Sequence, residues 1–175
     1  DHPLQQMIVE IIAEFAGMNP AKVVIALDGC GVPTFGLPLS RIALMFARLT
    51  AAARDASSDP GVITRAMQQH PLLFSGENRA DASLVLATAG RLVAKDGAEG
   101  LLGISVPDQG VGIAMKISDG SQRALIPAVS RLLRDLNYIT ADEAATLERL
   151  MPSIVRNNHG QPAGEMRPVL TIPAQ

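Results

Sequence analysis

Lysine side chains are the first candidates for chemistry in this sequence. A lysine one helical turn beyond a serine can take the hydroxyl proton and create a nucleophile, so the pattern Ser-x-x-Lys would indicate acyl transfer. The sequence has three lysines, Lys22, Lys95 and Lys116. They are preceded at the third position by Asn19, Leu92 and Ile113. These 175 residues therefore contain no Ser-x-x-Lys motif.

Lys95 has the most informative surroundings of the three. It follows the apolar run Leu92-Val93-Ala94 and precedes Asp96-Gly97-Ala98-Glu99-Gly100. We expect it where a strand meets a loop of small residues, which lets a ligand approach the backbone. A cation in that place can bind a carboxylate. The alternative is a solvated lysine at a strand end, which is the commoner case for any single lysine.

Other kinds of site have little support. His2, His70 and His159 are far apart and form no HxxxH pair, and Cys30 is the only thiol, so a self-contained zinc site is not expected. The glycines of DGCGVPTFG (28–36) match neither GxGxxG nor a phosphate loop and predict a tight turn. No serine lies in a GxSxG motif, so a serine triad is not indicated.

Composition excludes further classes. Hydrophobic residues make up 47% of the sequence and charged residues 18%, which is typical of a globular chain with a real core. A net charge of -2 and only 3% aromatic residues argue against nucleic-acid binding. The single cysteine excludes an internal disulfide, and no apolar run approaches the ~18 residues that span a bilayer. We therefore expect a cytoplasmic protein without membrane contact.

Hydrophobic spacing predicts the elements in the first half. Leu4, Ile8, Ile11, Ile12 and Phe15 indicate an amphipathic helix that Asp1 can cap and Gly17 ends. Residues 22–27 (KVVIAL) indicate a buried strand that leads into a sharp turn at 28–33. Further helices are predicted over about 39–54, from 59 to before 70, and over about 81–88.

The second half predicts a hairpin and two more helices. Residues 100–106 and 111–117 indicate strands joined by a tight turn at 107–110. An apolar stripe over 125–136 indicates a helix, and Thr140-x-x-Glu143 is a capping box that begins another, ending near Met151. Residues 165–172 are expected to add an edge strand. The order of elements predicts an α+β fold, with a mixed or antiparallel sheet and helices packed around it, in a single domain over 1–175.

Four segments together resemble a known family. They are DGCGVPTFGLPLSRIALMFARL (28–49), SGENRAD (75–81), AKDGAEG (94–100) and GVGIAMKISDGSQRA (110–124). In this order and spacing they resemble the carboxy-terminal half of the thermolabile, rhizobial-type L-asparaginases. That resemblance implies a fold like the serine β-lactamases and serine glutaminases, which use a Ser-x-x-Lys nucleophile. It also implies an upstream half that carries this motif, so that the 175 residues are an incomplete part of the full fold.

The resemblance implies roles for individual residues. Lys95 would face the nucleophile and, with Asp28, fix the charged end of the substrate. Arg79, Asp81, Gly97 and Glu99 would contact the substrate, although Ala80 and Asn78 stand where the family usually has an aromatic residue and a glycine. Cys30 is a candidate zinc ligand whose partners would lie outside this chain; the alternative is a small buried hydrophobic residue.

The function implied is hydrolysis of L-asparagine to L-aspartate and ammonia through a serine acyl-enzyme. No cofactor is required for this reaction, zinc binding is left open, and a homodimer is expected. A glutaminase or another amidase is an alternative, because amides that differ by one methylene change the barrier by only ~1–3 kcal/mol. A second alternative is a non-catalytic module that exposes apolar surface and self-associates.

Overall fold

The computed structural model describes residues 2–172 of the chain. Its α-helices are α1 (Pro3–Ala16), α2 (Leu39–Ala52), α3 (Asp59–Gln69), α4 (Pro71–Phe74), α5 (Ala80–Ala87), α6 (Leu125–Asp135) and α7 (Ala141–Leu150). Its strands are β1 (Val24–Leu27), β2 (Pro33–Gly36), β3 (Val93–Gly97), β4 (Leu101–Val106), β5 (Val111–Lys116), β6 (Ile154–Arg156) and β7 (Pro162–Glu165). The chain is therefore α+β, as the sequence predicts.

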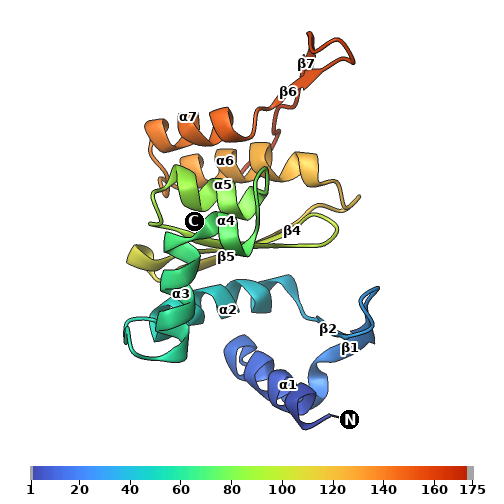
Figure 1. Cartoon of the computed structure of the whole chain (residues 1–175), viewed down its shortest axis with the longest axis vertical. Helices are drawn as coiled ribbons and strands as arrows, with labels where there is room; N and C mark the ends of the chain where they lie inside the picture. The colour runs from blue at the N-terminus through green and yellow to red at the C-terminus, as the bar shows by residue number, and fades with distance from the viewer. Residues whose placement is uncertain (1, 173–175) are drawn as a thin grey trace.

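The body of the molecule is a sheet of three antiparallel strands between two helical layers. The strand order is β3-β4-β5, which places β3 at one edge of the sheet. Helices α6 and α7 cover one face together with α5, and α2 lies across the other face (Figure 1). Among the described residues, no helix is both long and apolar enough to cross a membrane.

The hydrophobic core lies between the sheet and the layer formed by α5, α6 and α7. Its large, fully buried side chains come from all of these elements and are Leu84, Leu92, Leu102, Ile104, Leu125, Leu133 and Leu147. Alternate residues of β4 point into this core because successive side chains of a strand face opposite sides of the sheet. Burial of these side chains is what fixes β3 against α5.

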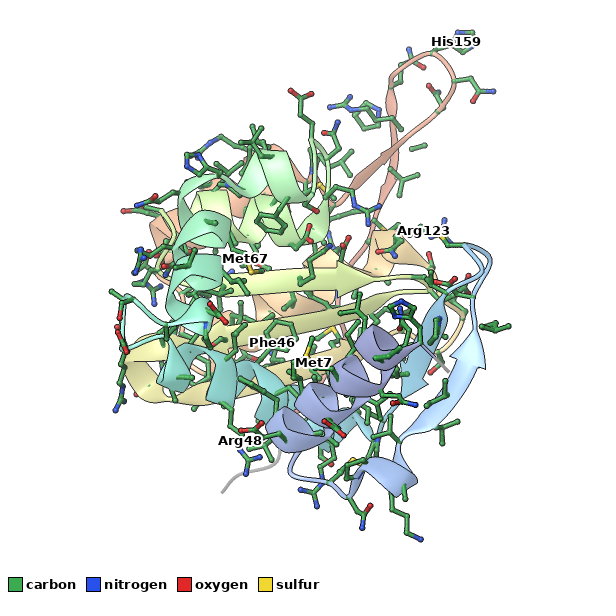
Figure 2. All side chains as sticks on the ribbon, turned by 60° about the horizontal axis from the view of Figure 1, so that its bottom comes forward. Met7, Phe46, Arg48, Met67, Arg123 and His159 are labelled. Carbon is green, nitrogen blue, oxygen red and sulfur yellow. The ribbon has the colours of Figure 1, made fainter. Side chains whose placement is uncertain are left out.

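The opposite face of the sheet is lined by small residues, so that α2 approaches closely. A Cβ atom added at Gly112 would lie 1.9 Å from the carbonyl oxygen of Ala43, and one added at Gly103 would lie 1.9 Å from the ring of Phe46. Phe46 lies against the strands in Figure 2. The Thr50 and Ser105 hydroxyls form a buried hydrogen bond of 2.6 Å between α2 and β4. Close packing and one polar contact thus fix the position of α2.

Several local predictions are confirmed. The capping box of α7 is complete, with Thr140 Oγ1 accepting from Glu143 N at 3.1 Å and Glu143 Oε2 accepting from Thr140 N at 2.8 Å. The hairpin turn is a 3-10 turn over Pro107–Gln109 that Gly110 closes at φ 64°. Asp1, the predicted cap of the first helix, lies outside the described residues. His2 is the observed N-cap of α1, because its Nδ1 atom accepts from Leu4 N at 3.2 Å.

The strand predicted at 22–27 is present as β1, but the prediction that it is buried is wrong. Strand β1 pairs with β2 in a separate hairpin, and its apolar side chains are exposed, as in Val24 at 65% and Leu27 at 74%. Its β-branched residues favour a strand, but the other described elements leave all of β1 exposed. Helix α1 is similar, because it buries only Ala13 and Ala16 and leaves larger apolar side chains open.

The predicted edge strand over 165–172 is also wrong. The tail instead forms a second hairpin from β6 and β7, whose residues are all exposed. This hairpin projects from the body, with His159 at its tip (Figures 1 and 2). Beyond Glu165 the described residues contain no strand, and Pro168 cannot donate a ladder hydrogen bond.

Candidate active site

Lys95 lies at the centre of β3, where it pairs with Gly103 of β4. The strand continues to Gly97, so the expectation that Lys95 lies at a strand end is wrong. Its Nζ atom lies 2.6 Å from Asp81 Oδ2 and 2.6 Å from Asp96 Oδ1. The side chains of Asp81 and Asp96 are 0% and 2% exposed, whereas that of Lys95 is 43% exposed. A half-exposed ammonium group therefore lies on two buried carboxylates.

The edge position of β3 makes this contact between neighbours possible. Lys95 and Asp96 are consecutive in the strand, so their side chains start on opposite faces of the sheet. Because β3 has no partner on its outer side among residues 2–172, both side chains reach around the same edge. Asp81 approaches this edge from the first turn of α5, which packs against β3.

Asp81 accepts hydrogen bonds on both of its oxygens. Oδ1 accepts from the hydroxyl of Ser75 and from Ala82 N at 2.8 Å, and Oδ2 accepts from Asp96 N at 3.1 Å as well as from Lys95. Desolvation by burial raises the pKa of the carboxyl, but the hydrogen bonds from Lys95, Ser75 and the backbone outweigh it and lower the pKa to about 2. Asp81 is therefore a permanent anion at neutral pH.

The environment of Lys95 raises the pKa of its ammonium group. Its partial burial lowers the pKa of the ammonium group, but the hydrogen bonds and charges of Asp81 and Asp96 outweigh this and raise the pKa above its ordinary value of 10.5. The ring of Phe74 adds a favourable surface, with Nζ 5.9 Å from its centroid. Lys95 is thus a cation that can bind an anion, and in this state it has no free electron pair with which to take a proton.

Arg79 belongs to the same cluster. Its Nη2 atom lies 2.8 Å from Asp96 Oδ2, and 46% of its side chain is exposed. It ends the loop 75–79, which is bent by Gly76 at φ 96° and Asn78 at φ 58° and held by the bond from Ser75 to Asp81. The fold therefore brings together three of the predicted residues, Lys95, Arg79 and Asp81.

Gly97 and Glu99 follow Lys95 at the end of β3. Gly97 O accepts from Gln122 Nε2 at 3.1 Å, and Glu99 O accepts from the ammonium of Lys116. Glu99 has a positive φ of 59° in the turn between β3 and β4. These contacts fix the turn beside the candidate site.

Asp28 and Cys30 lie in the exposed turn between β1 and β2. Asp28 Oδ1 accepts from Cys30 N at 2.9 Å, which closes the turn. No hydrogen bond or ion pair among residues 2–172 joins this turn to Lys95. The Cys30 thiol is exposed, so the alternative of a small buried residue is wrong. Across the described part of the chain, no cluster of three or more His, Cys, Asp or Glu residues could hold a metal ion.

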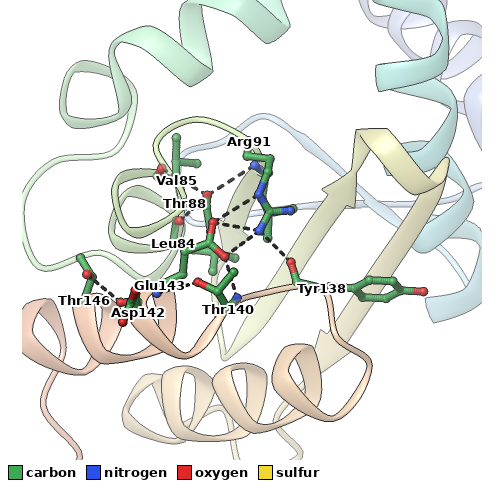
Figure 3. A network of polar contacts seen from close by, with 10 residues as sticks. Leu84, Val85, Thr88, Arg91, Tyr138, Thr140, Asp142, Glu143 and Thr146 are labelled. Atoms are coloured by element: carbon green, nitrogen blue, oxygen red, sulfur yellow. Dashed lines mark hydrogen bonds and ion pairs between the residues drawn. The ribbon is translucent and has the colours of Figure 1, made fainter.

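A second polar network holds the start of β3 (Figure 3). Arg91 Nη2 lies 2.7 Å from Glu143 Oε2 and 2.8 Å from the carbonyl oxygen of Tyr138, to which it donates. Desolvation raises the pKa of Glu143, but Arg91 and the backbone of Thr140 outweigh it and lower the pKa. Arg91 lies between α5 and β3, four residues before Lys95. The network joins it to the first turn of α7.

Sequence reasoning missed Asp96 and Ser75. A signal for Asp96 was present, because an acidic residue within an apolar strand is seldom buried without a partner. Lys95 was the partner to consider. Consecutive side chains of a strand point to opposite faces of the sheet, so the sequence does not predict a contact between Lys95 and Asp96. Ser75 had no comparable signal, since its bond to Asp81 depends on the shape of the loop between them.

Comparison with known protein families decides the assignment. The model of the L-asparaginase II family matches residues 1–168. The chain belongs to this family. Comparison with curated proteins finds no match. Family membership confirms the resemblance of the four sequence segments to L-asparaginases and places the chain among asparaginase-type amidohydrolases, which act on an amide such as asparagine. That the chain is a carboxy-terminal half stays a prediction.

Proposed function

We propose that the protein hydrolyses L-asparagine to L-aspartate and ammonia, and that this chain forms the side of the active site that binds the substrate's charged end. The observation that carries the proposal is the Lys95 ammonium on its two buried carboxylates. A free amino acid offers an α-carboxylate, and a fixed cation in a partly desolvated place binds it by charge-assisted hydrogen bonds. Orientation of the side-chain amide then follows from this anchor.

The proposed reaction proceeds through a serine acyl-enzyme. A serine hydroxyl oxygen attacks the side-chain amide carbon, a paired lysine moves the serine proton to the leaving nitrogen, and ammonia departs. Water then attacks the ester and releases aspartate, while backbone N–H groups stabilise the oxyanion in both steps. The nucleophile would come from a Ser-x-x-Lys segment upstream of these residues, because the motif does not occur within them.

Ser75 is a poor alternative nucleophile. Its hydroxyl donates to Asp81, whose pKa of about 2 makes the carboxylate too weak a base to remove the proton at neutral pH. The ammonium of Lys95 carries its own proton and cannot accept another. The charges of this cluster therefore favour binding and positioning over proton abstraction.

The other predicted residues stay proposals, with one change of role. Arg79 would bind the substrate beside Lys95. Asp81 was predicted to contact the substrate, but its side chain is 0% exposed, so it would act through Lys95 instead. Gly97 at the end of β3 and Glu99 in the turn after it would contact the substrate, and Asp28 would help Lys95 to fix the substrate's charged end. Cys30 would be one zinc ligand with partners outside this chain, since its thiol is exposed. No step of the reaction above requires the metal.

Ammonia release by an intact protein that includes an upstream Ser-x-x-Lys segment tests the proposal. Lys95→Ala should lower kcat/KM by roughly 10–10²-fold, because a hydrogen bond to a charged group contributes about 1.5–3 kcal/mol. Lys22→Ala, an exposed lysine in the turn before β1, is the matched control and should retain the wild-type rate. An unchanged rate in Lys95→Ala would remove Lys95 from the mechanism. Comparison of asparagine with glutamine decides between the two amides.

The exposed side of α1 favours a second candidate, self-association with another copy of the chain. Leu4, Met7 and Ile11, here called the α1 stripe, are 50%, 50% and 47% exposed beside an apolar groove of about 550 Å³ between α1, α2 and α3. The chain exposes 10562 Å², whereas a compact monomer of 18.4 kDa exposes about 8,200 Å². The excess of about 2,400 Å² exceeds the ~800 Å² that each partner buries in a typical dimer.

Sedimentation of the 175-residue chain tests this candidate. We expect a dimer whose Kd rises at least roughly tenfold in Ile11→Lys, because a charge in an apolar contact must be desolvated. Gln6→Lys, an exposed change outside the α1 stripe, is the control and should leave the Kd unchanged. A monomer at 100-micromolar concentrations, or equal effects of both substitutions, would reject the α1 stripe as a dimer interface.

A further inference from the structure

The carboxylate of Asp96 contacts two cations, one on each oxygen. Oδ1 lies 2.6 Å from Lys95 Nζ, and Oδ2 lies 2.8 Å from Arg79 Nη2. Asp96 is 2% exposed, whereas the two cations are 43% and 46% exposed. Both positive groups thus face outward from one buried anion. A single buried carboxylate thus joins the two cations.

Arg79 keeps donors for such a ligand. Its ion pair with Asp96 is formed at Nη2, and a guanidinium carries five N–H donors in a fixed plane. Lys95 has three N–H donors, of which two point to Asp81 and Asp96. The two side chains together therefore offer several charged donors on their exposed sides.

We propose that Asp96 is a positioning residue that holds Lys95 and Arg79 as a cation pair for the α-carboxylate of a free amino acid. The proposal rests on the proposed function and adds a positioning residue to its site. An asparagine within a peptide has its α-carboxyl group tied up in a neutral amide, which lacks the negative charge that pairs with Lys95 and Arg79. The cation pair would accordingly bind the α-carboxylate of L-asparagine more tightly than the neutral amide of L-aspartic acid diamide.

The two buried carboxylates would have different tasks. Asp81 contacts Lys95 and fixes it to α5. Asp96 is the link between Lys95 and Arg79, and it is the carboxylate that the structure shows paired with Arg79. Removal of the Asp96 charge would free the long Arg79 side chain. The conformational entropy lost when a ligand orders this side chain would then oppose binding. Loss of Asp96 should therefore weaken binding although Lys95 still has Asp81.

Lysine-selective NMR of the 175-residue chain tests the proposal without turnover. Only three lysines give signals, and Lys95→Arg identifies the signal of Lys95. L-Asparagine should shift the Lys95 signal in a saturable manner. L-Aspartic acid diamide, which has the same side chain but no carboxylate, should not shift it. Absence of any shift with L-asparagine, or equal shifts with both compounds, would overturn the cation pair.

Variants separate positioning from a structural role. Asp96→Asn should weaken L-asparagine binding at least roughly tenfold and lower the pKa of Lys95, and Asp96→Glu should recover part of both. Asp119→Asn, in an exposed loop where the amide oxygen can keep the bond from Ser121 N, is the control and should change neither. Weaker folding with unchanged binding and pKa would show that Asp96 is merely structural and overturn the proposal.

Arg79 is half exposed, so we expect Arg79→Gln to fold. It therefore tests the proposal if Asp96→Asn does not fold. It should weaken binding by a similar factor, and unchanged affinity would overturn the cation pair. Failure of the cation pair and failure of the proposed function give different results. Binding at Lys95 without ammonia release by the intact protein would reject the asparaginase reaction alone. Ammonia release with an unchanged KM in both variants would reject the cation pair alone.

Discussion

Asp81 is a fully buried carboxylate with two hydrogen-bond donors on each oxygen. A buried charge is tolerated when its hydrogen bonds and a counter-ion offset the desolvation, and here Lys95 supplies the counter-ion. The same arrangement that stabilises the fold also holds Lys95 in one position. At the scale of single residues, stability and the candidate site therefore depend on the same atoms.

Asp81→Asn should destabilise the fold by about 2–4 kcal/mol at neutral pH, because Lys95 loses a charged partner and the new amide group places a donor against Ser75 or the backbone. Urea unfolding measures this loss. Asp108→Asn, an exposed change in the turn between β4 and β5, should stay within about 0.5 kcal/mol of the wild type. Equal effects of the two substitutions would contradict the role of Asp81.

The lowered pKa of Asp81 also predicts a pH dependence. Its contribution to the free energy of unfolding is present above the ordinary pKa of 3.8 and is lost as the pH falls towards the folded value of about 2. The raised pKa of Lys95 has the opposite sign, so its contribution is present below pH 10.5 and is lost at higher pH. The stability difference between wild type and Asp81→Asn should accordingly shrink from about pH 4 to pH 2.

The sequence identifies Lys95, Arg79 and Asp81 as candidates, and the fold brings them together. Their arrangement could not be predicted, because it depends on β3 being an edge strand around which Lys95 and Asp96 both turn. Strand order is a property of the whole sheet and leaves no local pattern. The roles of Asp28 and Cys30 stay predictions, since their turn contacts no residue of the cluster through a hydrogen bond or ion pair within 2–172.

At the scale of elements, β3 is held at its start by the Arg91 network and along its length by α5. Arg91→Gln should destabilise the fold by about 1–3 kcal/mol, because it leaves Glu143 and the carbonyl of Tyr138 without their charged donor. Thermal or urea unfolding checks this value. Arg131→Gln removes an exposed pair with Asp135 on α6 and should cost less than about 0.5 kcal/mol. A larger loss of stability in Arg131→Gln than in Arg91→Gln would contradict the role of the Arg91 network.

The contact between α2 and the sheet predicts a larger effect. An alanine at Gly112 would place its Cβ 1.9 Å from the Ala43 carbonyl oxygen and 2.7 Å from Ala47 N. Both atoms belong to the helix backbone, so α2 must move, at a cost of about 3 kcal/mol or more. Gly164→Ala in β7, where an added Cβ meets nothing within 4 Å, is the control for unfolding measurements. A wild-type unfolding midpoint in Gly112→Ala would disprove the close approach.

Local patterns predict some elements better than others for a physical reason. The capping box of α7 and the turn before β5 depend on contacts between residues three positions apart, which the sequence contains in full. Burial of β1 depends on what lies over it. The run KVVIAL has the composition of a buried strand, yet every residue of β1 is exposed. A pattern can therefore predict a strand without predicting its surroundings.

At the scale of the whole molecule, the buried side chains are concentrated in the sheet and the α5–α6–α7 layer. The two hairpins and α1 contribute little to that core. Hydrogen exchange should follow this division, because protection depends on the unfolding that exposes each amide. Amides of β4 should exchange at least roughly a hundredfold more slowly than those of β1 and β7. Equal rates, measured by mass spectrometry, would mean that the molecule unfolds only as one unit.

The hairpin of β6 and β7 has a practical consequence for engineering. It stands away from the body, none of its side chains is buried, and its tip carries Asn157, Asn158 and His159. Loop tips of this kind tolerate inserted sequence, since nothing around them has to repack. An epitope or a fluorescent reporter spliced between Asn158 and His159 would leave the sheet and the Lys95 cluster undisturbed.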